Sequence, residues 1–232
     1  MNVDETIPQT RRKVRISHVL IILLLIGAAA FGIYRLSLRS RLRARIDAIR
    51  AAGYPVTCAE LDQWCTIPAD AENAAHTIMD AFSHYEQWDT EKSESLPLIG
   101  RAELPARTEP LPDEAKALAL QYIADNNEAL ALLHAGAAIE HCRYPVDLGA
   151  GFEALLPDMS NLKGGVKLLS LEAVFHAENG NSESAVRSVR SAFGIARSLE
   201  KEPILVSQLV RIACQALTVS TLERLVNRVE LT

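Results

Sequence analysis

Histidines, cysteines and arginines at several spacings in this sequence are of the types that metal binding or catalysis uses. His76, Asp80 and His84 fall four residues apart on an expected helix. Eight residues of helix separate the two histidines by about 12 Å, whereas metal–nitrogen bonds are about 2.1 Å long. The two histidines therefore cannot bind one ion, and we interpret these residues as a solvated helix edge and predict no metal site.

His141 and Cys142 place a base next to a thiol, which is the pairing that activates a cysteine nucleophile. Adjacent side chains rarely point at each other, and no third group that would orient the histidine is evident. A buried cysteine in a turn is the simpler interpretation. The sequence also contains no GxSxG elbow, HExxH motif or Gly-rich phosphate loop. We therefore predict no catalytic and no cofactor-binding residues, and a protein that is not an enzyme.

Cys58 and Cys65 look like a pair, but seven residues of helix separate their Cα atoms by about 10 Å. A disulfide needs a Cα separation below about 7 Å, so these residues can form a bridge only if the helix breaks. No CxxC spacing indicates a zinc or redox site. The sequence leaves open the disulfide state of these two cysteines and of Cys142 and Cys214.

Arginines on two expected helices could recognise a ligand or a partner. Arg211 is the only charged residue between Pro203 and Thr221, so we predict a buried carboxylate or carbonyl partner for it, with ligand recognition as the alternative. Arg187, Arg190 and Arg197 form a basic stripe, which we interpret as solvated, with a partner contact as the alternative.

The stretch that organises the chain is the uncharged apolar run from Ile16 to Tyr34. Its nineteen residues span about 28 Å as a helix, close to the ~30 Å hydrocarbon thickness of a bilayer. We predict a transmembrane helix over 14–35. A cleaved signal peptide, cut near Ala28–Ala30, is the alternative, but the apolar run continues through Phe31, Ile33 and Tyr34 beyond a usual signal core.

Charge divides unevenly on either side of this region. Residues 1–50 contain ten Lys and Arg against three Asp and Glu, whereas residues 51–232 contain 14 against 26. A domain with this excess of acidic residues repels the phosphate backbone of nucleic acids. We therefore do not expect a nucleic acid as a partner. We expect a disordered polar tail over 1–13 and a basic juxtamembrane helix over 36–53. Contacts with anionic lipid headgroups of the bilayer are expected from Arg35, Arg39, Arg41, Arg43 and Arg45.

A short basic tail before an apolar run is the layout of a signal anchor. We therefore predict a single-pass membrane protein with a cytoplasmic N-terminus and an extracytoplasmic domain, and the reverse orientation is the alternative.

Residues 54–232 show helical periodicity and no period-2 strand pattern, so the predicted fold class is all-α. We expect a hairpin-like or solenoid-like helical domain with a Pro-rich surface loop over 89–112. The expected helices cover 57–64, 71–88, 113–134, 157–178, 182–200 and 203–228. The last is apolar nearly all round and should lie in the core; Arg211 disfavours a second membrane span.

We also expect the domain to be truncated at its C-terminus. An apolar final helix normally needs neighbours on every side, and Thr232 is a residue type that caps a following helix. This predicts an exposed apolar groove beside Leu222, Leu225 and Val226.

The segment 166–203 resembles one degenerate tetratricopeptide-type hairpin, with small residues at Ala173, Gly180, Ala185 and Ala192. Larger blocks resemble a family of uncharacterised, membrane-anchored helical proteins of bacteria that has no established activity. These blocks are PADAENAA (68–75), CRYPVDLGAG (142–151), Leu156-Pro157 and PILVSQLVRIA (203–213). The resemblance implies a location and a fold only.

Two functions remain as hypotheses. The first is a non-enzymatic protein-interaction or scaffold module of the bacterial envelope, whose protein partner is unknown. The second is a membrane-anchored hydrolase or lipid-handling enzyme with an unidentified site. The lack of clustered catalytic residues favours the first.

Overall fold

A computed structural model describes residues 10–153 and 159–228, and it confirms the all-α fold class. Within those ranges there is no strand, and the nearest approach to one is an isolated bridge between Pro97 and Ala102. The chain divides into two units, residues 1–57 and 58–232.

The first unit is one long helix, α1 (Thr10–Ala51), of 42 residues. It begins inside the predicted polar tail, of which residues 1–9 lie outside the described part, and it joins the predicted span to the basic segment without a break. Gly53 ends it in the left-handed region, with φ of 83°, and its N–H donates to the carbonyl of Arg50. A side chain would be strained at that φ, so the glycine suits this helix end.

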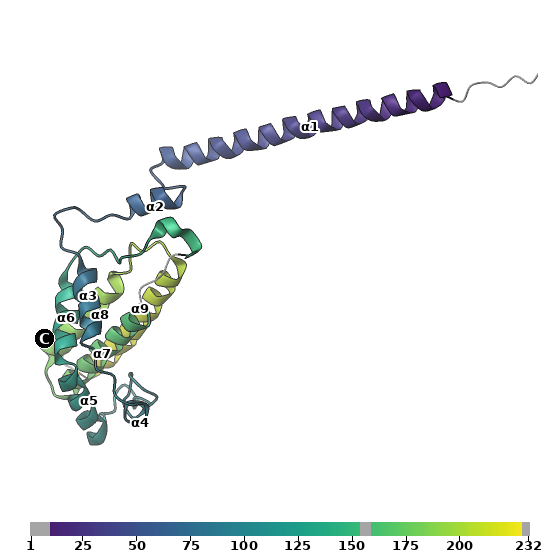
Figure 1. Ribbon diagram of the computed structural model, residues 1–232. Helices are drawn as coiled ribbons and strands as arrows, with labels where there is room; N and C mark the ends of the chain where they lie inside the picture. Colours follow the sequence, from purple (N-terminus) through teal and green to yellow (C-terminus); the bar gives the residue numbers. More distant parts are fainter. Residues whose placement is uncertain (1–9, 154–158, 229–232) are drawn as a thin grey trace, which may run out of the picture. The chain divides into compact units, whose positions relative to one another are not determined.

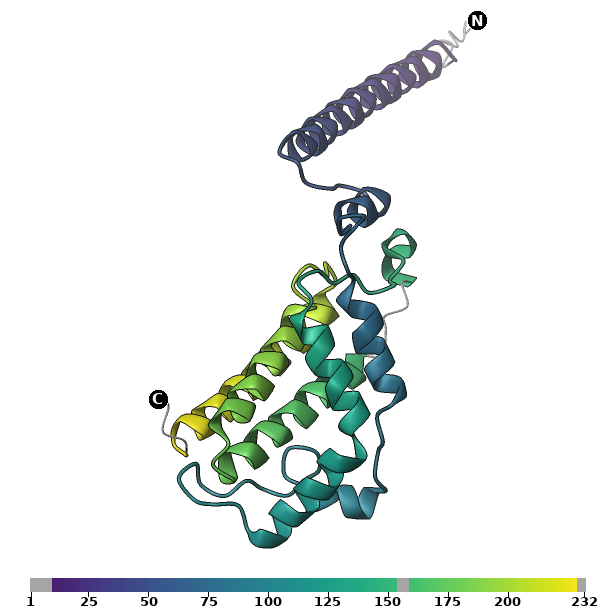
Figure 2. The same ribbon diagram turned by 90° about the vertical axis from the view of Figure 1, so that its left-hand side faces the viewer.

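The second unit is a layered helical domain, drawn in two views in Figures 1 and 2. Its short or peripheral helices are α2 (Cys58–Trp64), α3 (Ala74–Ser83), α4 (Thr90–Glu94), α5 (Asp113–Asp125), α6 (Asn127–Ala138) and the 3-10 helix η1 (Leu148–Glu153). Three longer helices follow, namely α7 (Met159–Glu178), α8 (Ser182–Arg197) and α9 (Leu205–Val226).

Helix α7 lies at the centre of this unit and contacts α5, α6, α8 and α9. Its buried positions include Leu168 and Leu169, which pack with Leu133 of α6 and Ile195 of α8 in one hydrophobic core. Helix α3 covers α6, and α2 packs against η1.

The α7–α8 hairpin forms where the sequence predicts it. Gly180 adopts a φ of 72°, and the side chain of Asn181 caps α8 by accepting from the N–H of Ser184 at 3.2 Å. Ala173 and Ala185, two of the predicted small residues, are buried between the helices. The wider tetratricopeptide and solenoid comparison stays a prediction.

The single helix predicted over 113–134 is wrong, because the chain breaks it at Asn126. That side chain is fully buried and pairs with the backbone of Glu86, accepting from its N–H at 2.9 Å and donating to its carbonyl at 3.1 Å. This pairing ends α5 and also anchors the segment after α3, whose helix stops at Ser83 instead of the predicted 88.

The prediction of a surface loop over 89–112 holds for most of the segment, which is exposed or half-buried, but not for all of it. The segment contains α4 and buries Leu96 and Leu111, which are 0% and 3% exposed. These two leucines hold the segment against the domain despite its prolines.

The prediction that the last helix lies in the core is correct for one side of α9 and wrong for the other side, which is exposed. One side of α9 is buried through Cys214, Thr218 and Leu225, which pack toward α7 and α8. The other side carries the exposed residues described below. The predicted exposure is therefore confirmed for Leu222 and Val226, which are 37% and 54% exposed, and wrong for Leu225, which is 2% exposed. The groove itself stays a prediction.

Two helices in the described ranges, α1 and α9, are long and apolar enough to cross a membrane. They differ in burial, because the apolar window of α1 is entirely exposed whereas 22% of the corresponding window of α9 is buried.

Candidate functional site

The outer side of α9 carries an exposed apolar stripe. Its residues repeat at alternating steps of four and three, and we call them the α9 seam: Leu205, Leu209, Ile212, Ala216, Val219, Glu223 and Val226. The large apolar members are between 44% and 73% exposed. Glu223 is the one polar member, and it forms an ion pair with Arg107. A strict 3.5-residue repeat of this kind is the pattern with which one helix packs along another.

Beside the seam, a cavity of about 670 Å³ lies between α6, α8 and α9. Four arginines line it, and we call it the arginine cavity. Its polar and small lining residues are His134, Arg187, Arg190, Ser191, Gly194, Arg197, Arg211 and Gln215. The stripe that the sequence singled out on α8 thus opens onto a hollow, together with Arg211 of α9.

Gly194 sets how closely α8 approaches α6 at this cavity. A Cβ atom at Gly194 would lie 2.5 Å from the carbonyl oxygen of Ala137 and 2.8 Å from its Cβ, so the contact requires glycine. We expect Gly194→Ala to reduce the free energy of unfolding by about 1–3 kcal/mol through overpacking. Gly164→Ala is the matched control, because its Cβ would meet nothing within 4 Å.

That control should gain about 0.5–1 kcal/mol from better helix propensity. Urea unfolding of the two variants measures the difference. Equal stabilities for Gly194→Ala and Gly164→Ala would show that the helices separate at no cost.

A buried polar cluster lies behind the arginine cavity. His134 Nδ1 is 2.7 Å from Ser191 Oγ, and its Nε2 is 2.9 Å from Glu172 Oε2. Ser188 Oγ donates to the same carboxylate oxygen at 2.6 Å. Burial raises the pKa of Glu172, but the hydrogen bonds from His134 and Ser188 outweigh it, so its pKa is lowered overall.

Ser191, His134 and Glu172 reproduce the order of a nucleophile, a base and an orienting carboxylate. The surroundings do not complete that chemistry. Ser191 is only 8% exposed and lies within α8, where backbone N–H groups bond to the preceding turn and are not available to stabilise an oxyanion. We interpret the cluster as a structural hydrogen-bond network that connects α6, α7 and α8.

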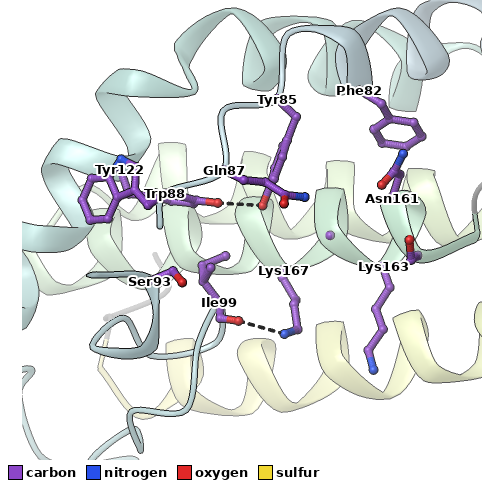
Figure 3. A pocket seen from close by; sticks show the side chains of 12 residues that line it. Phe82, Tyr85, Gln87, Trp88, Ser93, Ile99, Tyr122, Asn161, Lys163 and Lys167 are labelled. Atoms are coloured by element: carbon purple, nitrogen blue, oxygen red, sulfur yellow. Dashed lines mark hydrogen bonds between the residues drawn. The ribbon is translucent and has the colours of Figure 1, made fainter. Parts of the chain in front are cut away.

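A second cavity, of about 490 Å³, lies between α7 and the segment that follows α3 (Figure 3). Tyr85 and Tyr122 contribute aromatic rings, and their hydroxyls are 2.9 Å apart. Lys163 and Lys167 of α7 also line it, and Lys167 Nζ donates to the carbonyl of Ile99 at 3.1 Å. Burial and the neighbouring Lys163 lower the pKa of Lys167.

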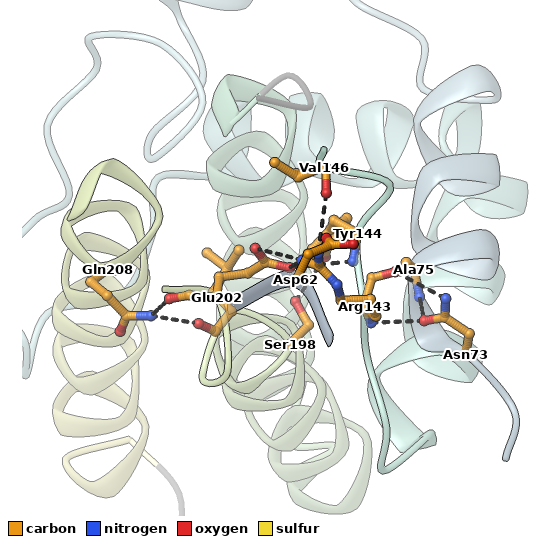
Figure 4. A network of polar contacts seen from close by, with 10 residues as sticks. Asp62, Asn73, Ala75, Arg143, Tyr144, Val146, Ser198, Glu202 and Gln208 are labelled. Carbon is orange, nitrogen blue, oxygen red and sulfur yellow. Dashed lines mark hydrogen bonds and ion pairs between the residues drawn. The ribbon is translucent and has the colours of Figure 1, made fainter. Parts of the chain in front are cut away.

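A third polar group, centred on Arg143, joins four segments of the domain (Figure 4). The guanidinium lies 3.5 Å from both carboxylate oxygens of Glu202, 3.0 Å from Asp62 and 3.1 Å from the carbonyl of Val146. Gln208 of α9 donates to the carbonyl of Glu202. Arg143 and Val146 belong to the CRYPVDLGAG block, so the network ties this block to α2 and to the segment before α9.

The prediction of a buried partner for Arg211 is wrong. Its side chain is 26% exposed and lies 3.7 Å from Glu200, whose own side chain is 56% exposed. The buried arginine of α9 is Arg224, 3% exposed, which pairs with Glu178. The difference arises because residues 105–109 fold over Arg224, while Arg211 faces the open cavity.

The structure also places the histidines and cysteines that the sequence offered as candidates for metal binding or catalysis. His84 lies 3.8 Å from Asp80 and 3.3 Å from Glu128, and no cluster of His, Cys, Asp and Glu able to hold a metal occurs in the part of the chain described. Burial raises the pKa of Cys142 to about 12, which opposes a thiolate nucleophile. All four cysteines are free thiols.

The chain matches no protein-family model, and neither curated proteins nor solved structures give a significant match. The resemblance to anchored bacterial proteins therefore stays a prediction.

Proposed function

We propose that the protein is anchored by α1 as a single membrane span and that its helical domain is a non-enzymatic protein-interaction module of the bacterial envelope. The α9 seam carries the second part of this proposal. The exposed apolar surface of α1 supports the first part. Helix α9 is the less suitable span, because one of its sides belongs to the domain core.

The segment of α1 after the apolar run supports a basic lipid contact. Its five arginines, Arg35, Arg39, Arg41, Arg43 and Arg45, are all exposed. Each basic residue near an anionic surface contributes about 1 kcal/mol. The proposed orientation has the N-terminus in the cytoplasm and the domain outside it.

A reporter fusion tests this orientation. Alkaline phosphatase attached after Thr232 is expected to be active in a bacterial host, because the enzyme folds only outside the reducing cytoplasm. A cytoplasmic reporter at the same position should be inactive. The reverse pair of results would overturn the orientation and leave the anchor intact.

The proposed occupant of the α9 seam is a helix of another protein, with apolar residues at the same spacing of four and three. The regular repeat of four and three along the seam is the spacing with which a partner helix packs, and Val206 and Leu222 beside it are exposed as well, at 47% and 37%. Arg211 and Gln215 border the seam on the side of the arginine cavity. The partner helix should therefore carry acidic residues along that edge.

The energetics favour a partner anchored in the same membrane. Full burial of one large apolar side chain contributes about 1.5–3 kcal/mol, and the seam offers five of them. Association itself costs about 4–15 kcal/mol. A partner held in the same bilayer has a higher effective concentration and so needs less contact energy.

Substitution in the seam tests the interaction. The double variant Leu209→Glu with Ile212→Glu places two charges at exposed seam positions, so it should abolish partner crosslinking in membranes while the domain stays folded. The matched control is Leu120→Glu, a leucine of similar exposure on α5. Unchanged crosslinking of the double variant, with unchanged thermal unfolding, would exclude the seam as the binding surface.

A further inference from the structure

We propose that the arginine cavity is a binding site for a phosphate group carried by a small organic molecule. This site adjoins the proposed helix contact, with which it shares Arg211 and Gln215, but most of its lining residues come from α8 and it needs no protein partner. The relevant feature is a concentration of guanidinium groups in a domain that is otherwise acidic.

The charge distribution is the first argument. Residues 51–232 have 26 acidic side chains against 14 basic ones, yet Arg187, Arg190, Arg197 and Arg211 all line this one cavity. Arg187 and Arg190 are exposed, so solvent screens part of the repulsion among these like charges, and a bound anion would offset the rest.

The local contacts leave most of this charge uncompensated. Among the described residues, Arg187 and Arg190 have no ion pair or hydrogen bond. Arg197 donates only to the neutral carbonyls of Ala137 and Ile139, at 3.1 and 3.3 Å. Acidic groups near the cluster include Glu200, which is 3.7 Å from Arg211, Glu140, which lines a neighbouring hollow together with Arg197, and Glu172, which is buried behind His134.

Arg211 has spare donor capacity as well. Its Nη1 donates to Gln208 Oε1 at 3.3 Å, and its Nε has no hydrogen-bond partner in the described parts of the chain. Unpaired guanidinium N–H groups beside a cavity are the donors that an oxyanion would use.

A cluster of several guanidinium groups suits a phosphate group. The planar fork donates two parallel hydrogen bonds to phosphate or carboxylate oxygens, and a phosphate offers enough oxygens for several forks at once. The cavity of about 670 Å³ is larger than a phosphate alone needs. It falls within the range of small-molecule pockets, which is about 300–1,000 Å³, so the ligand carries an organic part as well.

Two sources share this chemistry, namely a soluble phosphate ester and the headgroup of an anionic phospholipid. Calorimetric titration of the full chain in a neutral detergent distinguishes them. The soluble probes are inorganic pyrophosphate and glycerol 3-phosphate, and the lipid probe is dihexanoyl phosphatidylglycerol, with dihexanoyl phosphatidylcholine as its neutral-headgroup comparison.

The variants are the double substitution Arg187→Gln with Arg190→Gln and the control Arg101→Gln. Arg101 is also an exposed arginine, far from the cavity residues in sequence; its side chain is 85% exposed and lies 3.5 Å from Glu94. We expect saturable binding of at least one phosphate probe, weakened at least tenfold in the double variant and unchanged in the control. Thermal unfolding should be nearly the same in all three proteins, because neither cavity arginine has a partner to lose in the described structure and the pair of Arg101 with Glu94 is exposed.

Binding of glycerol 3-phosphate without phosphatidylglycerol identifies a soluble phosphate ester, and binding of phosphatidylglycerol without glycerol 3-phosphate identifies a lipid headgroup; both support the site, whereas binding of pyrophosphate alone contradicts the organic part of the ligand. The proposal is overturned if no probe binds saturably. It is also overturned if Arg101→Gln weakens binding as much as the double variant does, because the effect would then reflect overall charge alone.

Discussion

Replacing Glu178 with glutamine should lower the free energy of unfolding by about 3–5 kcal/mol, the usual loss when one partner of a buried ion pair is removed. The Glu178 side chain is 1% exposed. Its oxygens lie 3.4 Å from Arg224, 3.1 Å from Arg228 and 3.9 Å from Lys116, and one accepts from the N–H of Leu111. Glutamine keeps the shape but leaves the buried Arg224 guanidinium without a counter-charge.

Urea unfolding at neutral pH measures this loss. Glu223→Gln is the control, because Glu223 also pairs with an arginine, Arg107, but at the surface, with side chains 47% and 56% exposed. A surface pair of this kind contributes only about 0–1 kcal/mol. Similar losses for the two variants would contradict the account of Glu178 as the carboxylate that fixes residues 105–111 to α9.

Replacing Arg143 with methionine should cost a similar ~3–5 kcal/mol at neutral pH, because it leaves Glu202 buried without its cation. The Glu202 side chain is 2% exposed. Burial raises the pKa of Glu202, and the charge of Arg143 opposes that rise. Removal of Arg143 should therefore raise the pKa of Glu202 further.

This predicts a definite pH dependence. A carboxyl group whose pKa is higher in the folded state stabilises the fold fully below its unfolded pKa and loses that contribution as pH rises through the folded pKa. The deficit of Arg143→Met relative to the native protein should therefore be large at a pH of about 7.5 and smaller at about 4. Arg101→Met is the control, and a deficit that does not change with pH would show that Glu202 is not the group left unpaired.

Local signals predicted the parts of the fold that local residues determine. Asn179, Gly180 and Asn181 end α7 and cap α8, and the apolar run from Ile16 specifies a long helix before any partner is considered. The break at Asn126 has no such signal, because its cause is the backbone of Glu86, forty residues earlier. A single helix was the natural prediction there.

The burial of the two α9 arginines likewise depends on residues far away in the sequence. Arg211 is isolated in an apolar stretch and was predicted to be buried, while Arg224 lies in a more polar one. What decides the outcome is the segment 105–109, whose carbonyls contact Arg224. The fold of that Pro-rich segment over α9 cannot be inferred from periodicity.

The candidate site was visible in the sequence only in part. The arginine stripe of α8 follows from helical spacing, but its convergence with Arg211 depends on how α8 packs on α9. His134, Glu172 and Ser191 gave no signal, since they come from three helices and lie up to 57 residues apart. The α9 seam has a regular spacing, but the sequence could not say which side of the helix the domain leaves exposed.

Site-specific photocrosslinking tests the proposed helix contact most directly. A photoreactive amino acid placed at Ile212, at the middle of the α9 seam, should crosslink in native membranes to one protein. Mass spectrometry should place the crosslinked peptide on a helix with apolar residues at steps of four and three and acidic residues along one edge. The same probe at Leu120 should give no such product. Crosslinks from Ile212 to lipid alone, to a second copy of this chain, or to the same products as Leu120 would contradict the proposal that α9 binds a helix of another protein.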